Sequence, residues 1–454
     1  MDDRLGGAKL ARTLLGKVFP DHWSFMIGEL ALYAFVVLLL TGTYLTFFFE
    51  PSQTMVVYDG SYAPLRGVEM TEAYRSAIDL SFDVRAGLVM RQMHHWAALV
   101  FVAAIVVHLM RVFFTGAFRR PRELNWMVGV TLLILAIFNG FAGYSLLDDQ
   151  LSGTGLRIAY SVALSIPLIG TWIASLVFGG EFPGPDIITR LYVIHILLIP
   201  AVIVGLITAH LGILMRQKHT QFRGRGRRED NVVGERVWPS YAAKALGLLF
   251  LTSAVLAALG GLAQINPIWI YGPFEPAEVS AASQPDWYMG WLDGALRLMP
   301  GWEVRAFGFE IPTPFVPAVL LAGLTFVALY LWPFLEARVT KDHDTHHLLD
   351  RPRERPVRTA LGVATLAFYT VLTFAGASDV LSVTFGVSVN SVFRAFRVLL
   401  VVAPLLSGWA TYRLCKELSA HEAAAGGVGA AAGATPGDPP PEPPPVGLAT
   451  GHGR

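Results

Sequence analysis

Long apolar runs are the feature of this sequence that most limits how the chain can fold. Each run reaches or approaches the roughly 20 residues that an α-helix needs to cross the hydrocarbon core of a membrane. Eight such runs lie at Phe25–Phe49, Leu88–Phe114, Trp126–Leu147, Leu191–Met215, Ala242–Ala263, Phe315–Leu335, Val357–Ala377 and Val392–Leu414. Only 15% of the residues are charged, against about a quarter in soluble proteins. We therefore expect an all-α integral membrane protein with eight transmembrane helices.

Basic residues predict how these helices are oriented. With eight spans, both termini and the segments around 111–123, 216–244 and 336–358 lie on one side, and they hold most of the 35 Lys and Arg residues. Loops rich in Lys and Arg stay in the cytoplasm, so we expect a plasma-membrane protein with both termini cytoplasmic. The basic run at 223–228 is then a topogenic loop, and no nucleic-acid partner is expected.

One outer loop contains a further apolar stretch, Gly155–Gly179, which Pro167 and Gly170 interrupt. A ninth span at this place would reverse the charge bias of every loop that follows it. We therefore expect a helical hairpin that lies at the outer membrane surface.

Histidines within the apolar runs are the candidate chemical groups. Ionisable residues inside membrane spans are rare and mark functional sites by default. His94 and His108 lie 14 residues apart on the second helix, so they return to within about 40° of one face and stand about 21 Å apart along it. His195 and His210, 15 residues apart on the fourth helix, return to within about 60°.

The second and fourth helices run in the same direction, so His94 is expected level with His195 near the outer surface. His108 is expected level with His210 near the inner surface. Two bis-histidine levels suit two non-covalent b-type haems, whose irons are held by axial imidazoles. A zinc site would need more ligands close together. His95 competes with His94 as the outer ligand, but it faces about 100° away.

Glycines and arginines follow the same spacing. Gly28 and Gly42 on the first helix, and Gly129 and Gly143 on the third, are each 14 residues apart. Glycine permits close approach of a flat macrocycle, although small residues also occur at ordinary helix contacts.

Two arginines flank the histidines of the second helix. Arg91 precedes His94 by three residues, and Arg111 follows His108 by three. Guanidinium groups at these places can pair with haem propionates. Snorkelling of each side chain to the membrane surface is the alternative.

Together these residues resemble the cytochrome b subunit of respiratory cytochrome bc complexes, over roughly residues 20–415. The shared pattern consists of Gly28/Gly42, Arg91-x2-His94-x13-His108-x2-Arg111, Gly129/Gly143-Tyr144, His195-x14-His210 and Pro285-Asp286-Trp287-Tyr288. Segments such as His94-His-Trp-Ala-Ala are similar to the actinobacterial branch. That branch oxidises menaquinol and is joined to a terminal oxidase.

The resemblance implies a quinol–cytochrome c oxidoreductase subunit that oxidises menaquinol at an outer site. Electrons would pass through a low- and a high-potential haem b to an inner quinone site, contributing to the proton gradient in a Q cycle. The implied partners are a Rieske iron–sulfur protein, a cytochrome c subunit of the di-haem c type, a terminal cytochrome c oxidase in a supercomplex, a second copy of the complex and membrane lipids.

The resemblance also implies roles at the outer quinol site. Asp286 is expected to accept a quinol proton, together with Tyr288, because a carboxylate suits a general base. Tyr144, Pro285 and Trp287 are expected to bound the quinone ring. A simple helix cap is the alternative for Asp286.

The sequence departs from the family pattern at several positions. The usual motif is Pro-Glu-Trp-Tyr, so Asp286 keeps the carboxylate but has one methylene less. Met215 stands where mitochondrial relatives place an inner-site histidine, and Ala245 stands at the family's acidic residue on the fifth helix. Lys218 and His219 are the candidate substitutes, and the residues of the inner site stay open.

The expected organisation has four parts: a cytoplasmic N-terminal segment (1–24), a di-haem four-helix domain (25–235), a quinol-site four-helix domain (236–418) and a disordered Ala/Gly/Pro-rich tail (419–454). The single cysteine, Cys415, excludes an internal disulfide and covalent C-x-x-C-H haem attachment. The rival functions are a di-haem quinone-linked cytochrome that anchors another dehydrogenase or reductase, and a haem-free transporter with histidine proton relays.

Overall fold

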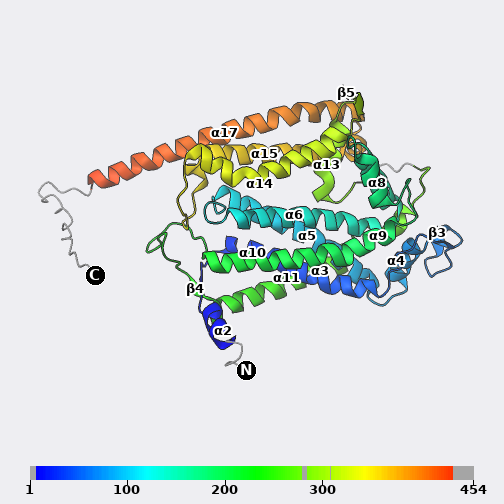
Figure 1. Ribbon diagram of the computed structural model, residues 1–454, viewed down its shortest axis with the longest axis horizontal. Helices are drawn as coiled ribbons and strands as arrows, with labels where there is room; N and C mark the ends of the chain where they lie inside the picture. Colours follow the sequence, from blue (N-terminus) through cyan, green and yellow to red (C-terminus); the bar gives the residue numbers. More distant parts are fainter. Residues whose placement is uncertain (1–6, 279–283, 307, 433–454) are drawn as a thin grey trace, which may run out of the picture.

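The computed structural model describes residues 7–278, 284–306 and 308–432. Its long helices lie alongside one another (Figure 1). Within the described residues, eight helical segments are long and apolar enough to cross a membrane: Ile27–Thr46, Gly87–Phe114, Glu123–Leu147, Ile187–Gln217, Val237–Leu262, Phe315–Thr340, Pro356–Ala375 and Val389–Glu422. The predicted all-α architecture with eight spans is confirmed.

Helices make up nearly all of the regular structure. The spans contain α3 (Ile27–Thr46), α5 (Gly87–Phe114), α6 (Glu123–Tyr144), α9 (Ile187–Val193), α10 (Ile199–Gln217), α11 (Ala242–Leu262), α14 (Leu321–Thr340), α15 (Pro356–Ala375) and α17 (Val389–Ala432). The shorter helices are α2 (Gly7–Leu15), α4 (Glu72–Phe82), α7 (Gln150–Leu164), α8 (Gly170–Phe178), α12 (Ile268–Tyr271), α13 (Trp287–Leu298) and α16 (Ser378–Phe385).

Three antiparallel strand pairs lie between the helices. They are β1 (Val18–Phe19) with β4 (Glu235–Arg236), β2 (Met55–Val57) with β3 (Glu69–Thr71), and β5 (Val304–Ala306) with β6 (Phe309–Ile311). Each pair is only two or three residues long, so the strands connect helices and do not form a sheet core.

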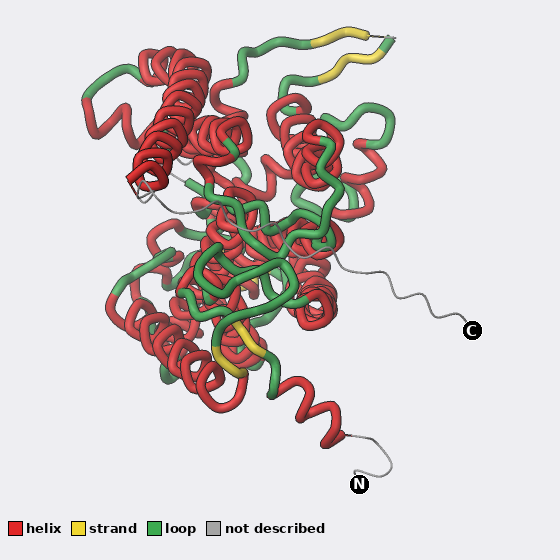
Figure 2. Tube along the Cα trace, turned by 90° about the vertical axis from the view of Figure 1, so that its left-hand side faces the viewer, coloured by secondary structure: helices red, strands yellow, loops and turns green. Residues whose placement is uncertain are grey.

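The connecting segments gather at the two ends of the helices. At one end, called here the inner end, lie α2, β4 and the C-terminal end of α17, and at the other, the outer end, lie α4, β3, α8 and β5 (Figure 1). Figure 2 looks onto the inner end, where loops and a short strand pair cross in front of the helices. Both described ends of the chain lie at the inner end, as an even number of spans requires.

The apolar stretch 155–179 does not form a ninth span. It belongs to a helical hairpin in which α7 and α8 pack on each other across a break that contains Leu168, at φ +68°. Neither helix is among the eight span candidates of the described chain. The predicted hairpin is confirmed, while its location at a membrane surface stays a prediction.

A layer of small and aromatic side chains fills the first four-helix bundle at mid-height. The rings of Phe35 on α3 and Phe101 on α5 stack with centroids 5.3 Å apart. Ala34, Ala97 and Ile203 are fully buried beside them. Because alanines allow the helix backbones to approach closely, this layer fixes the relative heights of the histidines above and below it.

The expected start of the C-terminal tail differs from the helix that the structure describes there. Helix α17 continues to Ala432, so the predicted start of the tail at residue 419 lies inside a helix. Alanine has the highest helix propensity, and the Ala-rich stretch extends the span. The remaining tail, 433–454, lies outside the described residues. Helix α11 packs against α3 and α5, and the division at 235/236 stays a prediction.

Candidate functional site

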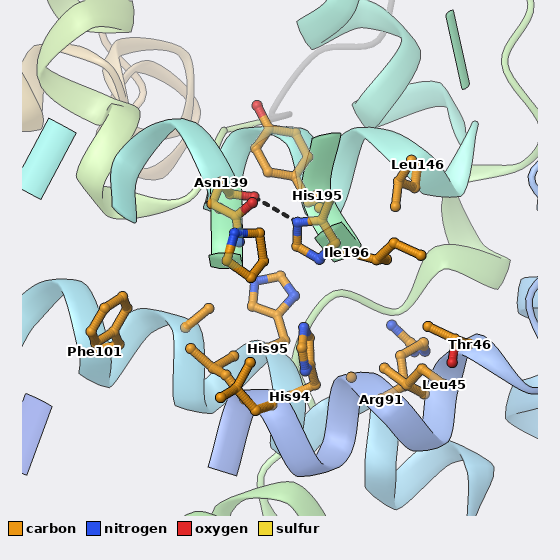
Figure 3. Close-up of a pocket in the computed structure, with 18 of the residues that line it drawn as sticks. Leu45, Thr46, Arg91, His94, His95, Phe101, Asn139, Leu146, His195 and Ile196 are labelled. Carbon is orange, nitrogen blue, oxygen red and sulfur yellow. Dashed lines mark hydrogen bonds between the residues drawn. The ribbon is translucent and has the colours of Figure 1, made fainter. Parts of the chain in front are cut away.

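The outer histidine pair joins two helices that are distant in sequence. His94 on α5 and His195 have ring centroids 6.1 Å apart, with the ring planes 76° from parallel. Nδ1 of His195 donates to the backbone carbonyl of Asn139 over 2.9 Å (Figure 3). Nδ1 of His94 lies 2.9 Å from the hydroxyl of Thr41, which itself donates to the Val37 carbonyl and is therefore an acceptor. Both rings thus keep their Nε2 lone pairs for a metal.

The inner pair repeats this arrangement. His108 on α5 and His210 on α10 have ring centroids 6.4 Å apart and planes at 72°. A metal bound about 2 Å from each of two opposed imidazole nitrogens places the ring centroids roughly 6 Å apart. Both pairs fit this requirement, and both join the histidines that the sequence placed at the same height.

A local irregularity explains why the two histidine spacings differ by one residue. His195 lies in a π-helical turn, Ile194–Leu198, directly before α10. Pro200 in the next turn has no N–H and crowds the carbonyl of Ile196, so the hydrogen-bond ladder widens by one residue there. The 15 residues from His195 to His210 therefore cover the distance that 14 residues cover on α5.

Each of the four predicted glycines faces a different histidine. A Cβ atom on Gly28 would lie 3.2 Å from Cε1 of His108, and one on Gly42 would lie 3.1 Å from Cε1 of His94. The third-helix glycines face the other two rings: a Cβ on Gly129 would be 3.7 Å from His210, and a Cβ on Gly143 would collide with His195. The glycines keep space open beside the imidazoles, while contact with a macrocycle stays a prediction.

The two arginines are buried cations with unused donors. Arg91 donates to Ser81 and to the carbonyl of Asn266, yet its Nη2 has no partner. Arg111 lies 4.2 Å from the centroid of the Phe25 ring, and its Nε and Nη2 are unpaired. Neither forms an ion pair with a carboxylate of the described residues. Buried guanidinium groups require an anion, so both residues fit haem propionates.

A cavity of about 400 Å³ surrounds the outer histidine pair. His94, His195 and Arg91 line it (Figure 3), and it extends to Asp286 and Tyr288 on α13. The predicted outer-site acid and the outer histidines therefore share one cavity, although the sequence separates them widely.

Asp286 occupies the N-cap position of α13, but its carboxylate caps no backbone amide. One carboxylate oxygen accepts a hydrogen bond from the hydroxyl of Tyr288 over 2.8 Å, and the other lies 2.7 Å from Nε2 of His95. The helix-cap alternative is therefore wrong for this side chain. Burial, together with the nearby Asp286, raises the pKa of Tyr288 well above its usual value, so this hydroxyl keeps its proton.

His95 is a site residue whose role the sequence did not predict. Its ring lies in the same cavity lining as His94 and His195, and its Nε2 reaches α13, where it lies 2.7 Å from a carboxylate oxygen of Asp286. The 100° offset between neighbouring helical residues was a usable signal, but only the fold shows that α13 lies on that side. His95 is thus the hydrogen-bonded partner of Asp286.

The predicted quinone-ring residues divide into two groups. Tyr144 lines the cavity, whereas Pro285 and Trp287 do not. Trp287 is 41% exposed, and its ring lies outside the lining, with its centroid 6.0 Å from that of Tyr288. Of the three predicted ring-bounding residues, only Tyr144 therefore reaches the cavity wall.

At the inner end, the two candidate substitutes differ. Lys218 is exposed and donates to the carbonyl of Asp230 over 3.2 Å. His219 packs against the rings of Phe19 and Phe25, with centroids 5.0 and 5.1 Å away. Burial lowers the pKa of His219 to about 4, so it is neutral at physiological pH. Only His219 lies inside the protein near Arg111.

The zinc alternative finds no support in the described chain. No group of three or more His, Cys, Asp or Glu side chains there is placed to hold a metal ion. The buried histidines instead meet in pairs, and two opposed imidazoles are the axial ligand set of a haem iron.

Comparison with known proteins gives related chains over most of this sequence. A chain of Corynebacterium efficiens is 52% identical over 415 residues, covering 91% of this chain and 76% of its own length. A chain of Mycobacterium leprae is 54% identical over 416 residues (91% and 75%), and one of Streptomyces coelicolor is 50% identical over 414 residues (91% and 76%). All three are named cytochrome bc1 complex cytochrome b subunit.

A family model and a solved structure agree with these relatives. The model described as cytochrome b (N-terminal)/b6/petB matches residues 99–273. A chain of a hyperthermophilic respiratory complex III superposes with a TM-score of 0.66 at 21% identity, covering 90% of this chain and 98% of that chain. At this identity the superposition shows a shared fold.

Proposed function

This chain belongs to the family of cytochrome b subunits of the cytochrome bc1 complex, the quinol–cytochrome c reductase, and we propose that it carries electrons between two bis-histidine haem sites. The observation that carries the proposal is the pair of opposed imidazoles at each of two heights. Haem b, when bound, supplies reversible one-electron redox chemistry. The identity of about 50% to bc1 subunits over 91% of the chain argues against the rival dehydrogenase anchor and the haem-free transporter.

Each group of residues has a distinct task in this proposal. His94 and His195 hold the outer haem iron, and His108 and His210 hold the inner one. Hydrogen bonds at Nδ1 fix the tautomer of the outer rings, so that Nε2 is the ligand atom.

Glycines and arginines complete the two sites. Gly28, Gly42, Gly129 and Gly143 leave room for the flat groups beside the four imidazoles. Arg91 and Arg111 bind propionates through their unpaired nitrogens, because buried guanidinium groups form strong charge-assisted bonds to carboxylates.

Asp286 is proposed to accept a proton from quinol at the outer site. Its carboxylate reaches the cavity between Tyr288 and His95, within hydrogen-bond distance of both. The protonated Tyr288 hydroxyl stabilises the carboxylate, and His95 orients it. A quinol hydroxyl entering the cavity meets an acceptor whose geometry is already set. Tyr144 lines the same cavity, whereas Pro285 and Trp287 lie outside its lining.

The proposed assembly follows the actinobacterial resemblance. The quinone is menaquinone, one electron of each quinol goes to a Rieske iron–sulfur protein, and the other crosses this chain to a quinone at the inner end. A cytochrome c subunit of the di-haem c type, a terminal cytochrome c oxidase and a second copy of the complex complete the supercomplex. The chain lies in the plasma membrane with both termini cytoplasmic.

A reduced-minus-oxidised spectrum with haem quantification tests the central proposal. We expect two non-covalent haems b per chain in the purified complex, extractable with acidified organic solvent, and their reduction by menadiol. One haem per chain, or a haem that stays with the protein after extraction, would contradict the two-level assignment.

Reporter fusions test the orientation. A reporter inserted after Arg225 is expected in the cytoplasm, and one inserted near Glu278 is expected outside, because Lys- and Arg-rich loops remain inside. The opposite reading at either position would show that the number of spans is wrong, with the Gly155–Gly179 stretch as the place of the error.

A further inference from the structure

Glu29 is a carboxylate within a membrane span that has no cationic partner among the described residues. It lies in the first turn of α3 and is only partly buried. The hydroxyl of Tyr33, one turn further on, donates to its Oε2 over 3.2 Å. The hydroxyl of Tyr241, directly before α11, donates to its Oε1. An acid at such a place is a functional candidate by default.

Its height places Glu29 beside the inner histidine pair. The preceding residue, Gly28, faces the imidazole of His108. Helices α3 and α11 pack against each other, and this contact brings Tyr241 to the same height from the other helix. Glu29 therefore lies at the level of the inner haem site and not at the outer cavity.

A solvent-exposed ion cluster lies one helical turn from Tyr241 in the sequence. Lys244 follows Tyr241 by three residues, on the same side of the helix. Its Nζ lies 2.9 Å from Asp21 and 3.0 Å from Glu235, and all three side chains are partly exposed. The exposed side chains of this cluster are open to water, and the hydroxyl of Tyr241, three residues before Lys244, donates to Glu29.

We infer that Tyr241 and Glu29 deliver the protons that a quinone takes up at the inner end of this chain. The inference rests on the proposed function, which supplies electrons at that end. Reduction of a quinone to quinol adds two electrons and two protons, and membrane lipid supplies no protons. A carboxylic acid linked to water by a hydroxyl group meets this need.

The transfer balances as follows. The O–H bond of protonated Glu29 breaks, and a new O–H bond forms on one quinone oxygen as the ring takes up electrons drawn from quinol oxidised at the outer site. The carboxylate then takes the hydroxyl proton of Tyr241, which regains one from water near Lys244. A second cycle protonates the other quinone oxygen.

A purely structural role is the competing explanation, because an acid in the first turn of a helix interacts favourably with the helix dipole. The chain provides a matched control in Glu123. It also lies in the first turn of a spanning helix, α6, and it has no hydrogen-bonded partner among the described residues. Glu123→Gln changes the charge at an equivalent position without touching the relay.

The test uses the complete purified complex with its haems. Menadiol is mixed with the complex by stopped flow, and the b-haem absorbance is followed through reduction and then re-oxidation by quinone. In Glu29→Gln we expect reduction at the parental rate, and re-oxidation slower by about 10²–10⁴-fold, the usual contribution of a proton-transferring group. Glu29→Asp should recover part of the rate, and Glu123→Gln should behave as the parent.

Two further readouts separate proton delivery from structural support. Re-oxidation in the parent should show a solvent deuterium isotope effect that Tyr241→Phe changes, although the ring stays in place. The redox-induced infrared difference spectrum of the parent should contain a protonated-carboxyl band that Glu29→Gln lacks. If Glu29→Gln loses haem, Tyr241→Phe decides the question in the same kinetic assay.

Parental re-oxidation rates in a haem-replete Glu29→Gln or Tyr241→Phe complex would overturn the inference. A parental complex that holds fewer than two haems, or that menadiol cannot reduce, would instead overturn the proposed function. The two failures are therefore distinguishable.

Discussion

The outer and inner halves of the first four-helix bundle share one arrangement of paired histidines. They differ in how many of their polar atoms have hydrogen-bond partners within the protein. At the outer level, both histidines have hydrogen-bonded Nδ1 atoms, and a cavity connects them to a paired carboxylate. At the inner level, Nδ1 of His108 and Nδ1 of His210 have no partner. The protein itself thus orients the outer imidazoles but not the inner ones, whereas the arginine of each level, Arg91 or Arg111, keeps unpaired donors that a bound anion can satisfy.

Removing one histidine from each level tests this comparison most severely. We expect His195→Ala to lose the outer haem and His108→Ala the inner one, since a single axial imidazole holds haem far more weakly than two. Redox titration of the b-haem absorbance would show which component disappears. His95→Ala is the control and should retain both haems. Loss of the outer haem component in His95→Ala would show that His95 is a ligand of the outer haem iron.

Asp286 tests the feature that only the outer half possesses. Asp286→Asn should retain both haems and slow quinol oxidation, at the lower end of the roughly 10²–10⁴-fold range for acid–base groups or below it, because Tyr288 or water can compensate in part. Asp286→Glu restores the usual family residue and should retain substantial activity. Steady-state quinol–cytochrome c reductase assays measure both. Quinol turnover at the parental rate in Asp286→Asn would contradict the proposed role of Asp286. The outer quinol site would then be supported only by the positions of the outer histidines.

The glycines sharpen the comparison on a smaller scale. A methyl group on Gly143 would collide with His195 at the outer level, whereas one on Gly129 lies at an ordinary 3.7 Å from His210 at the inner level. Overpacking typically costs about 1–3 kcal/mol, so Gly143→Ala should lower the thermal stability of the haem spectrum, and Gly129→Ala should change it little. Equal losses of thermal stability in the two variants would show that Gly129 and Gly143 are packed equally closely against their histidines.

The last test concerns Asp149 at the outer end. Its carboxylate caps α7 by accepting from the amides of Leu151 and Ser152, and burial raises its pKa to about 7. The unfolded value is about 3.9, so the folded state binds more protons between these values, and stability falls as pH rises through that window. Thermal unfolding of the parent from pH 5 to 8 should show this loss, and Asp149→Asn should reduce it. If the stability of Asp149→Asn changes with pH as steeply as that of the parent, the ionisation of Asp149 does not cause the loss of stability.

The sequence predicted what depends on helical periodicity. Spans, histidine levels and facing glycines all follow from spacing along single helices. It did not predict the contact of His95 with Asp286, which depends on how α13 packs against α5. It also left the one-residue difference between the histidine spacings unexplained, because that difference arises from a π-turn that Pro200 favours.

The inner end shows the same limit. Sequence reasoning sought substitutes near Met215 and proposed Lys218 or His219, whereas Glu29 and Tyr241 come together only because α3 packs on α11. Helix packing is set by many small contacts between side chains distant in sequence, and periodicity within one helix does not contain that information. The extent of α17 was misjudged for another reason, since Ala-rich sequence favours helix as readily as it permits a flexible tail.

The apolar layer between the two histidine levels has an electrical consequence. The levels stand about 21 Å apart along α5, about two-thirds of a hydrocarbon core that is roughly 30 Å thick. One elementary charge that crosses the whole membrane does work of about 2.3 kcal/mol per 100 mV. An electron that passes between the two levels therefore does work of about 1.5 kcal/mol per 100 mV. In the proposed orientation the cytoplasm is negative, and inward transfer is therefore opposed by the voltage that it helps to generate. Rising membrane voltage would then slow the proposed electron transfer across the layer of Phe35 and Phe101 without any residue moving.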